Sequence, residues 1–367
     1  MTVLDRYLLR SLLVNYGIGL GVMLSLYVVL DMFVNLDEFT ETNPGVLAAI
    51  LNMADYYTPN LFLYFSQLSG VITLFACTAV LARMRKLNEL TAFLASGISL
   101  FRIARPIIVF AVIATVFLTL DTELVIPSVA HKLARKRDDI AGQAAYEVLF
   151  MRDRGGALVS AARFDPKSSE LERMLVLVRD EDGSVVQTLE ADRAHWVAPD
   201  ETRWSGHWAL ERGRLTTRAA ADRSSLGPRQ QQEVSYPQVY ESDLDPKSIQ
   251  MRQAGGWVRF LSLGQLDELE KSGTADRTSI KQTRHARIVS PIVSLLLVLL
   301  GLPFFLDRSP GNMLSDAGRC MLVCGLCYII AFMSQSVRLE TELALAAWLP
   351  IFLFGPAAII LLDRVKT

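Results

Sequence analysis

Long apolar stretches gather near both ends of the chain and leave a mostly polar block between them. Each stretch is close to the roughly 20 residues that an α-helix needs to cross about 30 Å of hydrocarbon. Their approximate limits are 12–34, 60–82, 104–126, 288–306, 320–336 and 343–362. The pattern predicts an α-helical polytopic membrane protein with three spans, an inserted domain and three further spans. The expected domains are 1–126, 127–287 and 288–367.

The first stretch follows Arg6 and Arg10, as the apolar core of a signal peptide would. It is longer than the 7–15 apolar residues of a signal peptide, and no small-residue cleavage site follows it. We therefore expect a retained membrane helix.

Lysine and arginine in the short loops indicate the orientation of the chain in the membrane, because short loops that carry these residues tend to stay in the cytoplasm. These residues are Arg6, Arg10, Arg83, Arg85, Lys86, Arg102, Arg105, Arg364 and Lys366. The loop 35–59 has acidic residues and neither lysine nor arginine. Both termini and the second loop are therefore expected in the cytoplasm, with the inserted block on the other side.

The inserted block has the pattern of antiparallel β structure. Short runs rich in β-branched residues cover 158–162, 174–178 and 185–189, and Asp180–Gly183 is a turn signal between the last two. Aromatic runs continue the pattern to about residue 245, at the spacing of a sandwich or jelly roll. Leucines at helical spacing after Ser262 predict a helix that leads into the fourth span.

Composition adds little until the chain is divided, because the 51% hydrophobic content and the net charge of −1 average two membrane blocks with one polar block. All four cysteines lie in apolar stretches, which excludes a disulfide framework in the polar domain. They are Cys77, Cys320, Cys324 and Cys327. We expect them to be small packing residues.

Catalytic signatures are absent from the sequence: it has no phosphate loop, HExxH, GxSxG or metal-spaced Cys/His set. We expect no catalytic residue, metal or cofactor in this chain, so energy for transport would come from a partner. Asp31, Asp121 and Glu123 lie near the outer ends of their spans, where we expect them to snorkel to the interface.

The loop between the second and third spans, residues 83–105, carries an amphipathic pattern. Leu87, Leu90, Phe93 and Leu94 have helical spacing before a stop signal at Gly97. Such a helix either docks a cytoplasmic partner or lies on the lipid surface.

Several segments together resemble the LptF/LptG permeases of lipopolysaccharide export. They are Leu-Asp-Arg-Tyr-Leu-Leu from residue 4, Glu-Leu-Thr-Ala-Phe-Leu-Ala-Ser-Gly-Ile-Ser from 89, Arg-Ile-Val-Ser-Pro from 287, Gly-Leu-Pro from 301 and Ala-Ala-Trp-Leu-Pro from 346. The resemblance covers the chain end to end, and the first two segments favour LptG over LptF.

The resemblance implies a permease subunit of an ABC transporter in the bacterial inner membrane, with a periplasmic β jelly-roll-like domain. Such a subunit extracts lipopolysaccharide and passes it to a periplasmic β bridge towards the outer membrane. The implied partners are a second LptF/LptG-type permease, an LptB-like ATPase dimer that binds ATP and Mg, and LptC-like and LptA-like periplasmic proteins.

The resemblance also implies roles for individual residues. The loop becomes a coupling helix over about 84–98, whose ATPase contacts we assign to Glu89, Leu90, Phe93 and Arg85. A carboxylate suits charge-assisted hydrogen bonds to a partner arginine. The first and fifth spans become lateral gates, where Gly17, Gly21 and Gly325 allow close approach of another helix.

The chain departs from the family at the outer end of the first span, where basic residues commonly meet lipid A phosphates. This chain has Asp31 and Asp37 there. Three explanations are open. The partner permease supplies the positive charges, a basic cluster past the third span supplies them, or this chain carries a different lipid. The cluster consists of Lys132, Arg135, Lys136 and Arg137.

Two other classes of protein remain open on the sequence. One is a membrane-anchored periplasmic binding or structural protein without an ATPase. The other is a permease of another lipid or lipoprotein ABC system, although such permeases typically have four spans.

Overall fold

The chain folds into two compact units, one helical and one built on a β sheet. The helical unit comprises Met1–Leu36, Tyr57–Pro127 and Lys281–Thr367, and the β unit comprises Asp37–Tyr56 and Ser128–Ile280. The computed structural model describes residues 3–34, 46–134, 145–180, 183–199, 206–218, 232–254, 256–272, 275, 277–306, 312–336 and 343–363.

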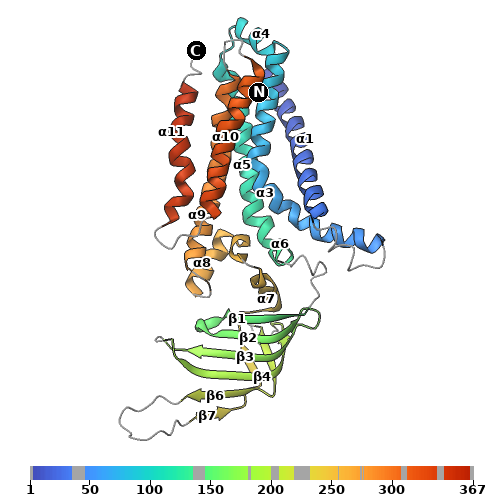
Figure 1. The fold of residues 1–367 in the computed structure, drawn as a ribbon, viewed down its shortest axis with the longest axis vertical. Coiled ribbons are helices and arrows are strands. Elements are labelled where there is room, and N and C mark those ends of the chain that lie inside the picture. The colour runs from blue at the N-terminus through green and yellow to red at the C-terminus, as the bar shows by residue number, and fades with distance from the viewer. Residues whose placement is uncertain are drawn as a thin grey trace. The chain divides into compact units, whose positions relative to one another are not determined.

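Long apolar helices form the helical unit (Figure 1). The helices that lie wholly or mostly in this unit are α1 (Val3–Val34), α3 (Val46–Lys86), α4 (Glu89–Ala95), α5 (Leu100–Leu120), α9 (Arg277–Phe305), α10 (Met313–Ser336) and α11 (Leu349–Asp363), and α6 (Ile126–Leu133) lies mostly in the β unit. Within the described residues, six stretches are long and apolar enough to cross a membrane: Val3–Val34, Met53–Lys86, Leu100–Leu133, Arg277–Phe305, Met313–Gln335 and Ala346–Asp363. This confirms the predicted arrangement of three spans on each side of an insert.

The helices are longer than the apolar stretches that predicted them. Helix α9 begins at Arg277, eleven positions before the expected 288, because its first turns are polar but still helical. The helical unit correspondingly resumes at Lys281. Hydropathy marks the apolar part of a span, whereas the backbone hydrogen bonds continue past it.

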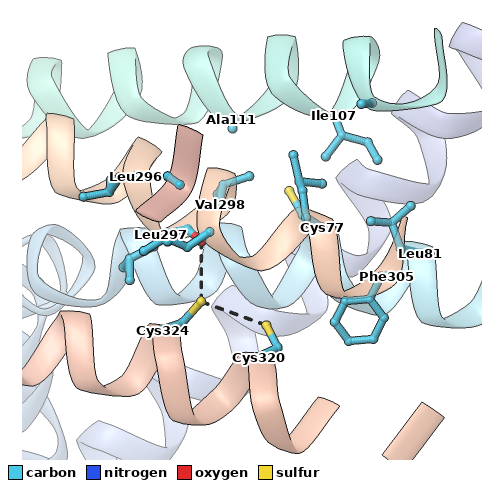
Figure 2. Packing of buried hydrophobic residues seen from close by; sticks show 14 of the residues in the cluster. Cys77, Leu81, Ile107, Ala111, Leu296, Leu297, Val298, Phe305, Cys320 and Cys324 are labelled. Atoms are coloured by element: carbon cyan, nitrogen blue, oxygen red, sulfur yellow. Dashed lines mark hydrogen bonds between the residues drawn. The ribbon is translucent and has the colours of Figure 1, made fainter. Parts of the chain in front are cut away.

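Small residues let the helices approach closely in the core of the helical unit. A Cβ atom added at Gly301 of α9 would lie 2.5 Å from Leu74 Cδ1 of α3 and 3.3 Å from Cys320 Sγ of α10. The Cys324 thiol donates to the Leu297 carbonyl at 3.6 Å and lies 4.0 Å from Cys320 Sγ (Figure 2). All four cysteines are buried free thiols within this packing.

An antiparallel sheet organises the β unit. Its strands are β1 (Tyr146–Arg152), β2 (Leu158–Asp165), β3 (Glu170–Arg179), β4 (Val185–Val197), β5 (His207–Glu211), β6 (Arg214–Arg218), β7 (Gln232–Ser235) and β8 (Val239–Glu241). Strands β1 to β4 pair in sequence order. The long strand β4 then pairs with β5 through 193–197 and with β6 through 187–190. Strand β8 joins β5, and β7 joins β6.

The predicted hairpin is present, with Arg179 of β3 paired to Val185 of β4 across the expected turn. Strand β1 begins at Tyr146, before the first expected strand at 158–162. The antiparallel sheet is thus confirmed, whereas the jelly-roll layout stays a prediction. Helices α7 (Pro246–Gln253) and α8 (Leu263–Ser272) follow the last strand.

A buried carboxylate fixes the last strand of the β unit to the turn after β1. Asp153 is fully buried and accepts hydrogen bonds from Tyr240 Oη at 2.9 Å, Ser242 Oγ at 2.6 Å and Asp243 N at 3.0 Å. Burial, together with the negative charge of Asp153, raises the pKa of Tyr240. The tyrosine hydroxyl therefore stays protonated and remains a donor.

Candidate functional site

Helix α4 is a short element bounded by two residues in the left-handed region of backbone conformation. Asn88 has φ 57° immediately before it, and Gly97 has φ 82° after it. The expected helix over 84–98 is therefore shorter, because residues 84–86 belong to α3 and the left-handed Asn88 interrupts the helix. The start of α1 and the end of α11 lie at the same end of the bundle as α4 (Figure 1).

The two faces of α4 differ in burial. Leu90 is 3% exposed and belongs to the core of the helical unit, and Phe93 packs partly against that core. Thr91, Ala92 and Ala95 are exposed. Leu90 therefore anchors the helix to its own chain, contrary to the partner contact assigned to it. The exposed face has small side chains, which permit another surface to come close.

Arg85 also differs from its assignment as a partner contact. Its side chain is 10% exposed and pairs with Asp316 of α10 at 2.9 Å. The same Nη1 donates to the Phe304 carbonyl near the end of α9 at 3.2 Å. Carbonyls in the last turn of a helix have no partner within that helix, so Arg85 satisfies one of them. It joins the ends of α3, α9 and α10 instead of facing outward.

Glu89 is the first residue of α4 and is half-buried. Its Oε2 accepts a hydrogen bond of 2.8 Å from the hydroxyl of Tyr7 in α1. A carboxylate has two oxygens with about four acceptor positions, so this contact leaves capacity for a further donor.

Two exposed apolar residues near α4 were not predicted as site residues. Phe101, at the start of α5, is 77% exposed, and Leu87 before α4 is 54% exposed. Phe101 lies out of phase with the buried stripe of α5 that includes Ile103, Ile107 and Phe110. That phase difference was the available sequence signal. Exposed apolar groups around a short helix are typical of an interaction surface.

The glycines of the first span divide between two faces. A Cβ atom at Gly19 would meet Phe75 at 3.0 Å and Ile72 at 3.6 Å, so this glycine brings α1 close to α3. At Gly17, Gly21 and Gly325, no atom of the described residues lies within 4 Å of such a Cβ. The Gly17–Gly21 pair therefore faces away from the described part of this chain.

Charged groups near the outer helix ends are engaged within the chain. Lys132 of α6 pairs with Asp55 of α3 at 3.0 Å in an exposed ion pair. Asp31 accepts a hydrogen bond from Tyr57 Oη at 3.1 Å. The other proposed phosphate contacts, Arg135, Lys136 and Arg137, lie outside the described residues.

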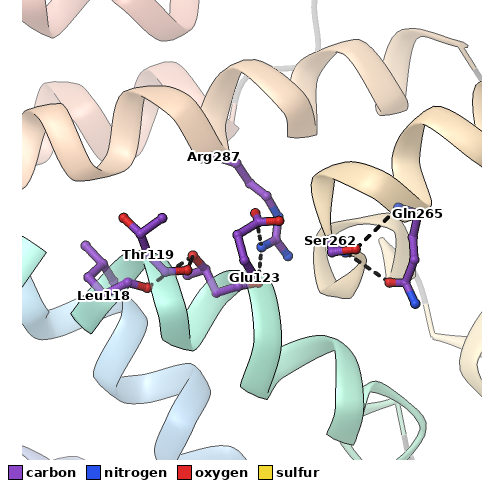
Figure 3. A network of polar contacts seen from close by, with 7 residues as sticks. Leu118, Thr119, Glu123, Ser262, Gln265 and Arg287 are labelled. Atoms are coloured by element: carbon purple, nitrogen blue, oxygen red, sulfur yellow. Dashed lines mark hydrogen bonds and ion pairs between the residues drawn. The ribbon is translucent and has the colours of Figure 1, made fainter. Parts of the chain in front are cut away.

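A buried ionic cluster lies where α5 passes through a π-helical turn, Asp121–Val125. Arg287 of α9 pairs with Glu123 Oε1 at 3.1 Å and also donates to the Thr122 carbonyl (Figure 3). Asp121 is 6% exposed, and its Oδ2 has no hydrogen-bond partner among the described residues. The snorkelling expected for Asp121 and Glu123 was wrong, because Arg287 draws the negative charges inward. A π-helical turn interrupts the regular backbone hydrogen bonds of an α-helix, and Arg287 donates to one carbonyl of this turn.

These features define a class: a membrane protein with six candidate spans, an inserted β unit and an exposed helix between the second and third spans. Among the described residues, no group of three His, Cys, Asp or Glu is placed to hold a metal ion.

The family model described as "Lipopolysaccharide export system permease LptF/LptG" matches residues 6–364. The chain belongs to this family and is a multi-pass inner-membrane protein of lipopolysaccharide export. The family includes both LptF and LptG, so the preference for LptG stays a prediction. No curated protein sequence matches the chain.

Proposed function

We propose that this chain is one membrane half of an ATP-driven lipopolysaccharide exporter and that α4 docks a separate ATPase. The observation that carries the proposal is the geometry of α4. Leu90 anchors the helix in the core, while its small outward residues and the Glu89 carboxylate remain available to a partner. Leu87 and Phe101 extend this surface with apolar area.

The ATPase lies on the cytoplasmic side in this proposal. Helix α4 is flanked by the basic residues of the second loop, and the start of α1 and the end of α11 lie at the same end of the bundle. The positive-inside rule assigns such an end to the cytoplasm. The β unit is then periplasmic and passes lipid to LptC-like and LptA-like proteins.

A second LptF/LptG-type permease completes the membrane portion. The Gly17–Gly21 face of α1 supplies a surface that another helix can approach closely. Gly325 offers an equivalent small position on α10. Lys132 can exchange its exposed ion pair with Asp55 for a lipid phosphate, because such exposed pairs contribute only about 0–1 kcal/mol.

Replacing Glu89 by lysine tests the docking assignment. Charge reversal removes the carboxylate and places like charges opposite a basic partner, so we expect ATPase binding to weaken at least about tenfold. The measurement is recovery of the ATPase with the tagged permease pair from detergent-solubilised membranes. Membrane insertion should be unchanged, because Glu89 is not a core residue.

Glu268→Lys is the matched control, since Glu268 is an exposed glutamate of α8 and undergoes the same charge change. ATPase recovery with this variant should equal that of wild type. Equal recovery with Glu89→Lys would show that Glu89 has no part in docking.

A further inference from the structure

The opening segment of the chain meets α4 through a side-chain hydrogen bond. Tyr7 and Glu89 are 82 residues apart in sequence, and the tyrosine hydroxyl donates to Glu89 Oε2 at 2.8 Å. Both residues belong to segments that carry the family resemblance, yet docking alone assigns no role to Tyr7. The contact directly joins the first span to the helix assigned to the ATPase.

Both helices are also anchored in one hydrophobic core next to this hydrogen bond. Leu8 follows Tyr7 and Leu90 follows Glu89, and both leucines are buried in the same core cluster. Each helix therefore buries in this core the residue that follows its hydrogen-bonded one.

Helix α4 depends on such contacts for its position. It has seven residues, and the side chain of Asn88 makes no capping hydrogen bond to it. Isolated helices shorter than about 12 residues are marginal in water, so tertiary contacts must hold a helix of this length. With turns at both ends, the orientation of α4 is set by its anchors in the helical unit.

The geometry points to Tyr7 as a positioning residue for coupling. By occupying Oε2, it fixes the rotamer of Glu89 and leaves Oε1 directed to a basic group of the ATPase. It also makes α1 respond to any displacement of α4, because the hydrogen bond joins the two helices directly. This inference rests on the proposed docking of an ATPase at α4.

The test is Tyr7→Phe in the full chain, assembled with its permease partner, with the affinity of the purified ATPase measured by titration. The substitution keeps the ring and removes only the hydroxyl. Loss of a preorganising hydrogen bond to a charged group should weaken ATPase affinity about three- to tenfold. In a Glu89→Ala background, Tyr7→Phe should cause no further loss, because the hydroxyl acts through that carboxylate.

Tyr27→Phe is the matched control. Tyr27 lies on α1 about 30 Å further along the helix, and its ring centroid is 4.0 Å from that of Tyr64. Its loss of a hydroxyl should leave ATPase affinity at the wild-type value.

The outcomes separate this inference from the proposed function. If Glu89→Ala weakens the affinity and Tyr7→Phe does not, the positioning role is overturned and the docking assignment stands. If Tyr7→Phe weakens the affinity equally in both backgrounds, its effect is structural and the positioning role is again overturned. If the wild-type permease pair binds no ATPase, both the proposed function and this inference are overturned.

Discussion

Replacing Asp153 by alanine should destabilise the β unit by about 3 kcal/mol or more. The substitution leaves three donors without their acceptor: the hydroxyls of Tyr240 and Ser242, and the backbone N–H of Asp243. Ser242 is buried and Tyr240 is half-buried, and a buried polar group without a partner costs roughly 1–3 kcal/mol. Hydrogen exchange of the sheet amides, measured on the full chain in detergent, should accelerate about 100-fold.

Asp192→Ala is the control for this experiment, because it removes the same side chain from an exposed position. Asp192 pairs with Arg212 at the surface of the same unit. Exposed pairs of this kind contribute little, so the exchange of the sheet should change by less than about threefold. Similar exchange in the two variants would show that the Asp153 network does not hold the sheet.

Replacing Arg287 by alanine should destabilise the helical unit by about 3–5 kcal/mol. Glu123 then loses its ion-pair partner, Asp121 loses the nearest positive charge, and the Thr122 carbonyl loses a donor. Removal of one member of a buried ion pair carries a cost of this size because a buried charge is left uncompensated. Thermal unfolding of the full chain in detergent, followed by the helical signal in circular dichroism, should show the loss as a lower transition temperature.

Two further variants make this prediction specific. Arg319→Ala removes an arginine that is 71% exposed and lies 4.0 Å from Asp316, a weak ion pair at the surface. The transition temperature should therefore barely change. Adding Glu123→Gln to Arg287→Ala should restore part of the stability, because it removes one buried negative charge. A transition for Arg287→Ala no lower than that for Arg319→Ala would contradict the buried-pair interpretation.

Local patterns predicted much of this fold. Apolar runs of about 20 residues gave the six spans, and the turn signal between 174–178 and 185–189 gave the β3–β4 hairpin. Both features depend on neighbouring residues, which a single sequence displays directly. Strand β1 was missed because its seven residues contain a single β-branched residue, Val148, and so lack the composition that marked the other strands.

Contacts between distant segments could not be read in the same way. Arg287 lies 164 residues from Glu123, and no local pattern indicates that it turns the outer carboxylates of α5 inward. The burial of Leu90 depends on the direction in which α4 leaves the left-handed Asn88, and that of Arg85 depends on Asp316, which is 231 residues away in sequence. The candidate site in the second loop therefore stays a prediction, while the division between anchoring and exposed residues required the structure.

Purification of the tagged chain from its native membrane in mild detergent, with mass spectrometry of the proteins recovered with it, tests the central claim most directly. An ATP-driven export permease should bring a P-loop ATPase and a second six-span permease of the same family. Recovery of the chain alone, under conditions that preserve other ABC complexes, would contradict the proposed function and favour a membrane-anchored periplasmic binding protein.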